Sequence, residues 1–135
     1  MDAAVKELVR RRAADICEYC RLPQQWSPDL RLQIEHIIPL KHHGGHENAN
    51  LALACADCNL HKGPNIAGID PLSLRMTELF NPRQHQWHEH FEEIDGQITG
   101  KSAIGRTTVD VLNMNSTEQV EVRLMIAILP ENPIS

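Results

Sequence analysis

Aromatic residues are scarce in this chain of 135 residues, at only 4% of the total. A small core with few large rings has less apolar surface to bury, and a metal site is one way to supply the missing stability. No run of 18 or more apolar residues is present, so we expect no transmembrane helix. Residues 1–12 are rich in charge and lack the apolar stretch of a signal peptide, so we expect a cytoplasmic protein.

Net positive charge is also lacking, because the formal net charge is −5 and the isoelectric point is near 5.9. Proteins that bind nucleic acids usually carry a basic face. This balance argues against tight, sequence-independent DNA binding, although Arg10, Arg11 and Arg12 form a local basic run. We interpret that run mainly as the solvated face of a helix, with contacts to DNA phosphates as the alternative.

The hydrophobic pattern predicts a small α+β protein in which helices and short strands alternate. We expect a helix over 3–15, strands at 30–34 and 51–54 with a polar loop over 41–50 between them, and a short helix from 55 that ends at Gly63. Residues 64–86 are expected to be mostly loop. A hairpin of 88–94 and 97–101 follows around Asp95-Gly96, then helices over 105–113 and from Ser116 or Thr117 to about Leu129, and a frayed tail at 131–135.

The length suits one domain over residues 1–135. Within it we expect a motif core at 17–63 and an accessory hairpin with helices at 70–130. Trp87 and Phe91 are expected to fill the core. The apolar stripe of Val120, Leu124 and Ile128 is expected to be core or the face of a homodimer.

Four cysteines form two Cys-x-x-Cys pairs, Cys17 with Cys20 and Cys55 with Cys58. In a reducing compartment such pairs indicate a metal site rather than disulfides. Two residues between thiolates allow both sulfurs to face one tetrahedral ion, which is the geometry that zinc prefers. Four protein ligands leave no vacant position for water, so we expect this zinc to be structural, with any chemistry located elsewhere.

The segment between the cysteine pairs carries a series of motifs in a fixed order. Ile34-Glu35-His36-Ile37-Ile38-Pro39 precedes Gly44-Gly45, Asn50-Leu51, Cys58-Asn59 and Lys62-Gly63. This series resembles the HNH endonuclease family in its zinc-containing Cys-x-x-Cys branch, over about a third of the chain. The resemblance implies a ββα-metal (His-Me) finger braced by the zinc site.

The resemblance also implies a role for each motif residue. His36 would be the general base that activates water, and Asn50 would anchor the loop that helps to orient it. Glu35 and Asn59 would be oxygen ligands of a catalytic Mg²⁺ or Mn²⁺ ion, and such ligands suit both metals. The family more often has Asp where this chain has Glu35, and often has His where it has Asn59, which leaves the preferred metal open.

The resemblance implies hydrolysis of phosphodiester bonds in DNA, expected to be double-stranded, with cleavage of one strand at a time as a nickase. Lys62 could contact a phosphate or simply be solvated. The histidines of the polar loop and of the following helix are expected to be solvent-facing or weak DNA contacts, namely His42, His43, His46 and His61. The alternative is a non-catalytic zinc module that binds nucleic acid or protein, which would need only the cysteines. A nuclease that acts only within a larger complex is a third interpretation.

Overall fold

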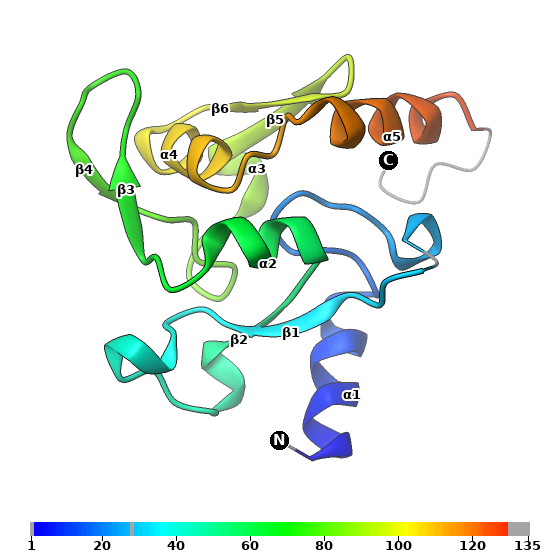
Figure 1. Ribbon diagram of the computed structural model, residues 1–135, viewed down its shortest axis with the longest axis vertical. Helices are drawn as coiled ribbons and strands as arrows, with labels where there is room; N and C mark the ends of the chain where they lie inside the picture. Colours follow the sequence, from blue (N-terminus) through cyan, green and yellow to red (C-terminus); the bar gives the residue numbers. More distant parts are fainter. Residues whose placement is uncertain (1, 28, 130–135) are drawn as a thin grey trace.

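The computed structural model describes residues 2–27 and 29–129 as a mixed α+β structure (Figure 1). The helices are α1 (Ala3–Arg12), α2 (Ala56–Lys62), α3 (Trp87–His90), α4 (Ala103–Val111) and α5 (Thr117–Ala127), and three single 3₁₀ turns occupy Gln24–Trp26, Leu40–His42 and Asn48–Asn50. The strands are β1 (Gln33–His36), β2 (Leu51–Ala54), β3 (Ala67–Ile69), β4 (Met76–Glu78), β5 (Phe91–Ile94) and β6 (Gln97–Gly100). The strands pair as three antiparallel hairpins, β1–β2, β3–β4 and β5–β6.

Helix α1 begins where the Asp2 carboxylate accepts a hydrogen bond of 2.9 Å from the Val5 amide. It ends at Arg12, three residues earlier than expected, because Ala14 and Asp15 both have a φ of 55° and cannot continue a right-handed helix. Helix α1 packs against β2. Its early end sends the chain directly into the first cysteine pair.

The β1–β2 hairpin and helix α2 form a ββα unit. Glu35 of β1 lies opposite Ala52 of β2, and α2 contacts β1. The expected strand at 30–34 is displaced to 33–36, and Leu30 lies exposed before it. The strand at 51–54 and the short helix ending at Gly63 are confirmed.

The second half of the chain contains the β3–β4 hairpin and the short helix α3, neither of which was expected. Residues 64–86 include the β3–β4 hairpin, which projects beside α4 in Figure 1 and contacts that helix. The expected hairpin around Asp95-Gly96 is confirmed, with positive φ at both turn residues, but it begins only at residue 91 because residues 87–90 form α3. The two predicted C-terminal helices are present as α4 and α5, and Ser116 caps α5. The predicted frayed tail lies outside the described residues.

Buried apolar side chains form one cluster that extends from Val9 to Met114. Phe91 is fully buried as expected, and Trp87 is half-buried against the cluster. Leu124 of α5 and its C-cap residue Ile128 are exposed, so these two side chains are not part of the core, which was one of the two expectations for them. Within the described residues, no helix is both long and apolar enough to cross a bilayer.

Candidate functional site

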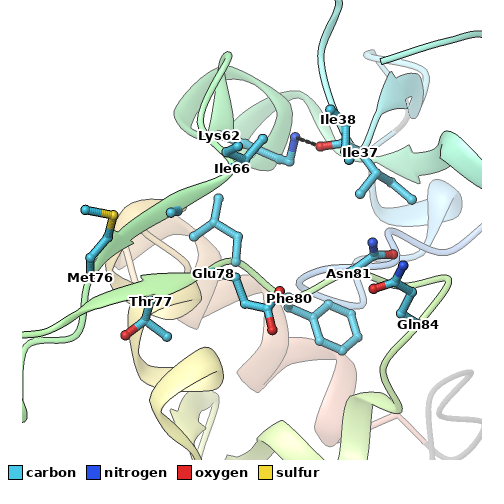
Figure 2. A pocket seen from close by; sticks show the side chains of 12 residues that line it. Ile37, Ile38, Lys62, Ile66, Met76, Thr77, Glu78, Phe80, Asn81 and Gln84 are labelled. Atoms are coloured by element: carbon cyan, nitrogen blue, oxygen red, sulfur yellow. Dashed lines mark hydrogen bonds between the residues drawn. The ribbon is translucent and has the colours of Figure 1, made fainter. Parts of the chain in front are cut away.

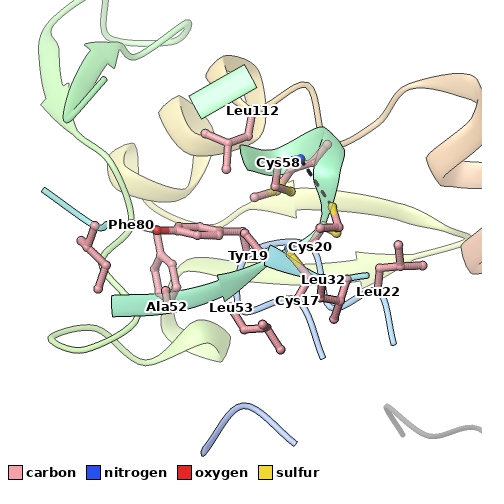
Figure 3. Close-up of a cluster of buried hydrophobic side chains, with 14 of the residues drawn as sticks. Cys17, Tyr19, Cys20, Leu22, Leu32, Ala52, Leu53, Cys58, Phe80 and Leu112 are labelled. Carbon is pink, nitrogen blue, oxygen red and sulfur yellow. Dashed lines mark hydrogen bonds between the residues drawn. The ribbon is translucent and has the colours of Figure 1, made fainter. Parts of the chain in front are cut away.

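The four cysteines converge on one buried point between the segment after α1 and the start of α2. Figure 3 labels three of them, Cys17, Cys20 and Cys58. The four sulfur atoms all lie within 4.8 Å of one another, and the Sγ atoms of Cys20 and Cys55 are 3.6 Å apart. A tetrahedral zinc with Zn–S bonds of about 2.3 Å separates its sulfurs by about 3.8 Å. The cluster therefore fits a structural zinc, and none of the four thiols is in a disulfide.

Main-chain amides already face two of these sulfurs. The amide of Cys20 donates to Cys17 Sγ at 3.5 Å, and the amide of Cys58 donates to Cys55 Sγ at 3.4 Å. Each bond lies within one Cys-x-x-Cys pair and favours negative charge on the accepting sulfur. The two-residue spacing thus produces the same local turn in both pairs.

Strand β1 directs two neighbouring side chains to opposite faces, as its period of two requires. Glu35 is buried, whereas His36 is half-buried. Both residues line an open cavity of about 390 Å³, together with Asn59 of α2 and Lys41 of the loop. The structure thus brings Glu35, His36 and Asn59 to one hollow, although they are spread over 25 residues of sequence.

The Glu35 carboxylate has a partner at each oxygen. Oε1 accepts a hydrogen bond from the Tyr19 hydroxyl, and Oε2 forms an ion pair of 3.1 Å with Lys62 Nζ. Burial raises the pKa of Glu35, while Lys62 and Tyr19 act in the opposite direction. Burial, followed by the Glu35 charge, also raises the pKa of Tyr19 well above its ordinary value, so the phenol stays protonated and can donate.

Lys62 lies in the interior, and this corrects the idea that it contacts DNA phosphates or is solvated. Its side chain is 2% exposed. Besides Glu35, its ammonium donates to the carbonyl oxygen of His36 at 3.2 Å and to that of Ile37 at 2.9 Å, and Figure 2 shows the second of these bonds. Lys62 therefore ties α2 to the end of β1, next to the candidate base.

The Asn50 side chain holds the loop that follows β1. Its Oδ1 accepts from the Ile38 amide at 2.8 Å, and its Nδ2 donates to the carbonyls of Ile38 and Gly45 at 2.9 Å each. Gly44 packs so closely here that a Cβ atom would overlap the Ile38 carbonyl oxygen. This is the loop-anchoring arrangement that the resemblance implies for Asn50.

His36 contacts a histidine that sequence reasoning had treated as solvent-facing. His36 Nε2 lies 2.8 Å from Nδ1 of His46, whose exposed ring comes from the loop after Gly45. Burial, then the charges of His46 and Lys62, lowers the pKa of His36. The contact between His36 and His46 could have been predicted from the position of His46, which directly follows Gly44-Gly45, where the chain turns back toward β1.

Asn59 lies at the cavity with its amide nitrogen engaged, since Nδ2 donates to Gln33 Oε1 at 2.5 Å. Its Oδ1, the atom that would bind a cation, has no hydrogen bond among the described residues. On α1, Arg10 and Arg12 donate to main-chain carbonyls of Leu32 and Leu51, and the exposed Arg11 pairs with Glu7. Two of the three arginines thus brace the ββα unit.

A second cavity of about 360 Å³ lies between the end of β1 and the β3–β4 hairpin (Figure 2). Its walls are largely apolar, with Ile37 and Ile38 on one side and Ile66 and Met76 on the other. Lys62, which is buried in the ββα unit, also lines this cavity. The hairpin that sequence reasoning missed therefore lies next to the residues that follow His36.

Residues 17–65 match the family model described as HNH endonuclease. The matched segment contains both cysteine pairs, the β1–β2 hairpin and α2, and it ends before β3. Comparisons with curated proteins and with solved structures each found no significant match.

Proposed function

From the match of residues 17–65 to HNH endonucleases, we propose that this protein is a metal-dependent endonuclease that hydrolyses phosphodiester bonds in double-stranded DNA, one strand at a time. The observation that supports the proposal is the shared cavity, because Glu35, His36 and Asn59 all line it. A zinc-binding module that only recognises a partner would not require this set.

His36 is suited to the role of general base. The lowered pKa favours the neutral imidazole, and a ring nitrogen of that form can accept a proton from water. Lys62 holds the carbonyl of His36, and Asn50 holds the loop that carries His46. The base is thus fixed from both sides before any substrate arrives, which favours catalysis.

Glu35 and Asn59 are the residues that would hold a catalytic Mg²⁺ or Mn²⁺ ion. Asn59 Oδ1 is open, and each oxygen of an ionised carboxylate has more than one lone-pair site, so the contacts of Glu35 with Lys62 and Tyr19 still leave acceptor capacity. When bound, such a cation would polarise the phosphate and neutralise charge on the leaving oxygen. The expected products carry 5′-phosphate and 3′-hydroxyl ends.

Lys41 offers a better phosphate contact than Lys62. Its side chain is exposed and lines the same cavity as His36. On α1, the exposed Arg11 would extend this contact, because Arg10 and Arg12 already donate to main-chain carbonyls. Because the net charge is −5 and few cations would contact the DNA, we expect weak binding with a shallow salt dependence, since the slope grows with the number of phosphates neutralised.

Plasmid nicking tests the proposal. Supercoiled DNA is incubated with purified protein and Mg²⁺ or Mn²⁺, and open-circle product is followed on a gel. We expect His36→Ala to lose at least about 100-fold in rate, the usual contribution of a general base. The matched control His88→Ala removes an exposed histidine remote from the cavity and should cut normally. Equal cutting by His36→Ala and wild type would exclude His36 as the base.

One observation favours a non-catalytic zinc module instead, because both Glu35 oxygens are occupied by protein groups. Such a module would act in a reducing compartment such as the cytoplasm, where its thiols stay available for zinc. Wild-type protein that binds DNA and never cuts it with either cation would establish this alternative.

A further inference from the structure

Helix α5 lies outside the segment that holds the cysteines, and two of its buried side chains are polar. Its buried residues are Gln119, Arg123 and Ile126, and Arg123 is only 3% exposed. The guanidinium donates through Nε to the Gly96 carbonyl at 2.6 Å and through one terminal nitrogen to the Met114 carbonyl at 2.6 Å. Its other terminal nitrogen, Nη1, is buried without a hydrogen-bond partner among the described residues.

A buried guanidinium requires negative charge nearby, because moving an unpaired ion out of water is costly. Among the ion pairs formed by the described residues, none joins Arg123 to a carboxylate. The charges of Cys20, Glu93, Cys58 and Cys55 raise the pKa of Arg123, while burial, the largest influence, lowers it.

Helix α5 is attached to the second cysteine pair by a direct side-chain bond. Gln119 Nε2 donates to Asp57 Oδ2 at 2.6 Å, and Asp57 lies between Cys55 and Cys58. Arg123 follows Gln119 by four residues, so both side chains lie on one face of the helix. The face that carries Arg123 is therefore directed toward the metal-binding turn at the start of α2.

We propose that Arg123 is the counter-cation of the cysteine–zinc centre. Four thiolates around one Zn²⁺ carry a net charge of −2, and all four cysteines are buried, so little water is available to screen that charge. The Arg123 guanidinium halves the net charge without coordinating the ion. The proposal rests on the zinc assignment but not on nuclease activity.

This role gives α5 a function in metal retention, although the helix lies more than 50 residues beyond the last cysteine. Removal of the positive charge should weaken zinc binding, because partners around a metal's ligands typically contribute about 10- to 100-fold in affinity. Loss of zinc should in turn release Arg123 from its counter-charge. We therefore expect docking of α5 and zinc binding to be thermodynamically linked.

Zinc affinity is measured by competition with a chromophoric chelator, on the full chain without DNA. We expect Arg123→Gln to bind zinc about tenfold or more weakly, whereas Arg123→Lys, which keeps the charge, should stay closer to wild type. The control Arg106→Gln removes an arginine that pairs with Asp70 and should leave zinc affinity unchanged. Equal affinity in Arg123→Gln and wild type would overturn the proposal.

A second variant covers the case in which Arg123→Gln does not fold. Asn115 Oδ1 already accepts from Arg123 at 3.0 Å, so Asn115→Asp places a carboxylate beside the guanidinium that competes with the thiolates for its charge. This variant loses the bond of 2.8 Å from Asn115 Nδ2 to the Ile98 carbonyl, so circular dichroism checks that it folds. We expect the folded variant to bind zinc more weakly than wild type. Unchanged zinc affinity in Asn115→Asp would contradict the proposal. Wild-type protein that contains no zinc would refute the metal centre itself, and this result is independent of the nuclease activity measured with plasmid DNA.

Discussion

Replacement of Lys62 by Met tests the arrangement that holds the candidate site together. Methionine has a similar length and no charge, so Lys62→Met leaves the Glu35 carboxylate buried without its cation. It also removes the donor to the carbonyl oxygens of His36 and Ile37. The substitution changes both the electrostatics of the interior and the support of the candidate base.

The expected cost follows from burial of the pair, since the two side chains are only 2% and 4% exposed. Removal of one partner of a buried ion pair costs about 3–5 kcal/mol, because the remaining charge stays out of water. A domain of this size has a total free energy of unfolding of about 5–15 kcal/mol. We therefore expect Lys62→Met to lose a large part of its stability, with a Tm lower by about 10–20 °C.

Urea unfolding followed by circular dichroism gives the free energy of unfolding of each variant. The matched control Lys6→Met removes an exposed lysine from α1 and should change stability by less than about 0.5 kcal/mol. The double variant Glu35→Gln/Lys62→Met should recover part of the loss, because it leaves no unpaired buried charge. The reasoning is refuted if Lys62→Met is as stable as Lys6→Met, or if the double variant shows no recovery.

Three further predictions concern stability. Gly44→Ala should lower the free energy of unfolding by at least about 1 kcal/mol, because the added Cβ meets the rigid Ile38 carbonyl. In the control Gly45→Ala, the added Cβ meets only the flexible Glu47 side chain. Chemical denaturation compares the two variants, and equal losses of stability would contradict the packing argument. The hydrogen bond from Arg106, with those from the neighbouring loop, lowers the pKa of Asp70. The stabilisation by Asp70 is therefore present at neutral pH and is lost progressively as the pH falls below about 4. Asp70→Asn should be less stable than wild type at pH 7, and its free energy of unfolding should decline less from pH 5 to 3; an unchanged acid profile would refute this. Metal analysis should find one zinc per chain, and a strong chelator should unfold the protein, whereas zinc-free protein with a native circular dichroism spectrum would disprove a structural role.

The cysteine cluster and the ββα unit could be predicted from the sequence because their signals are local. Two Cys-x-x-Cys pairs and a terminal glycine each depend on a few neighbouring residues, and the structure has these features where the motifs indicated them. The first strand also forms, although it lies at 33–36 and not at 30–34. The Asp95-Gly96 turn is equally local. Predictions of this kind succeed because backbone geometry alone restricts the residue types.

The missed features depend on contacts between residues far apart in the sequence. The β3–β4 hairpin has strands of only three residues, and its loop is fixed by a bond from Arg106 to Asp70, 36 residues apart. Burial of Lys62 required knowledge that Glu35 would face inward, since an isolated lysine is usually solvated. Short strands and long-range ion pairs leave no periodic signal in the chain.

The adjacency of Glu35 and His36 makes stability and chemistry inseparable within a single dipeptide. A slip of one residue in the pairing of β1 with β2 would turn the carboxylate toward water and the imidazole into the core. Such a shifted hairpin would be unstable and inactive together, so misregistered molecules could not persist as folded but defective proteins. The same alternation limits mutational change, because an exchange of these two residues would abolish both properties in one step.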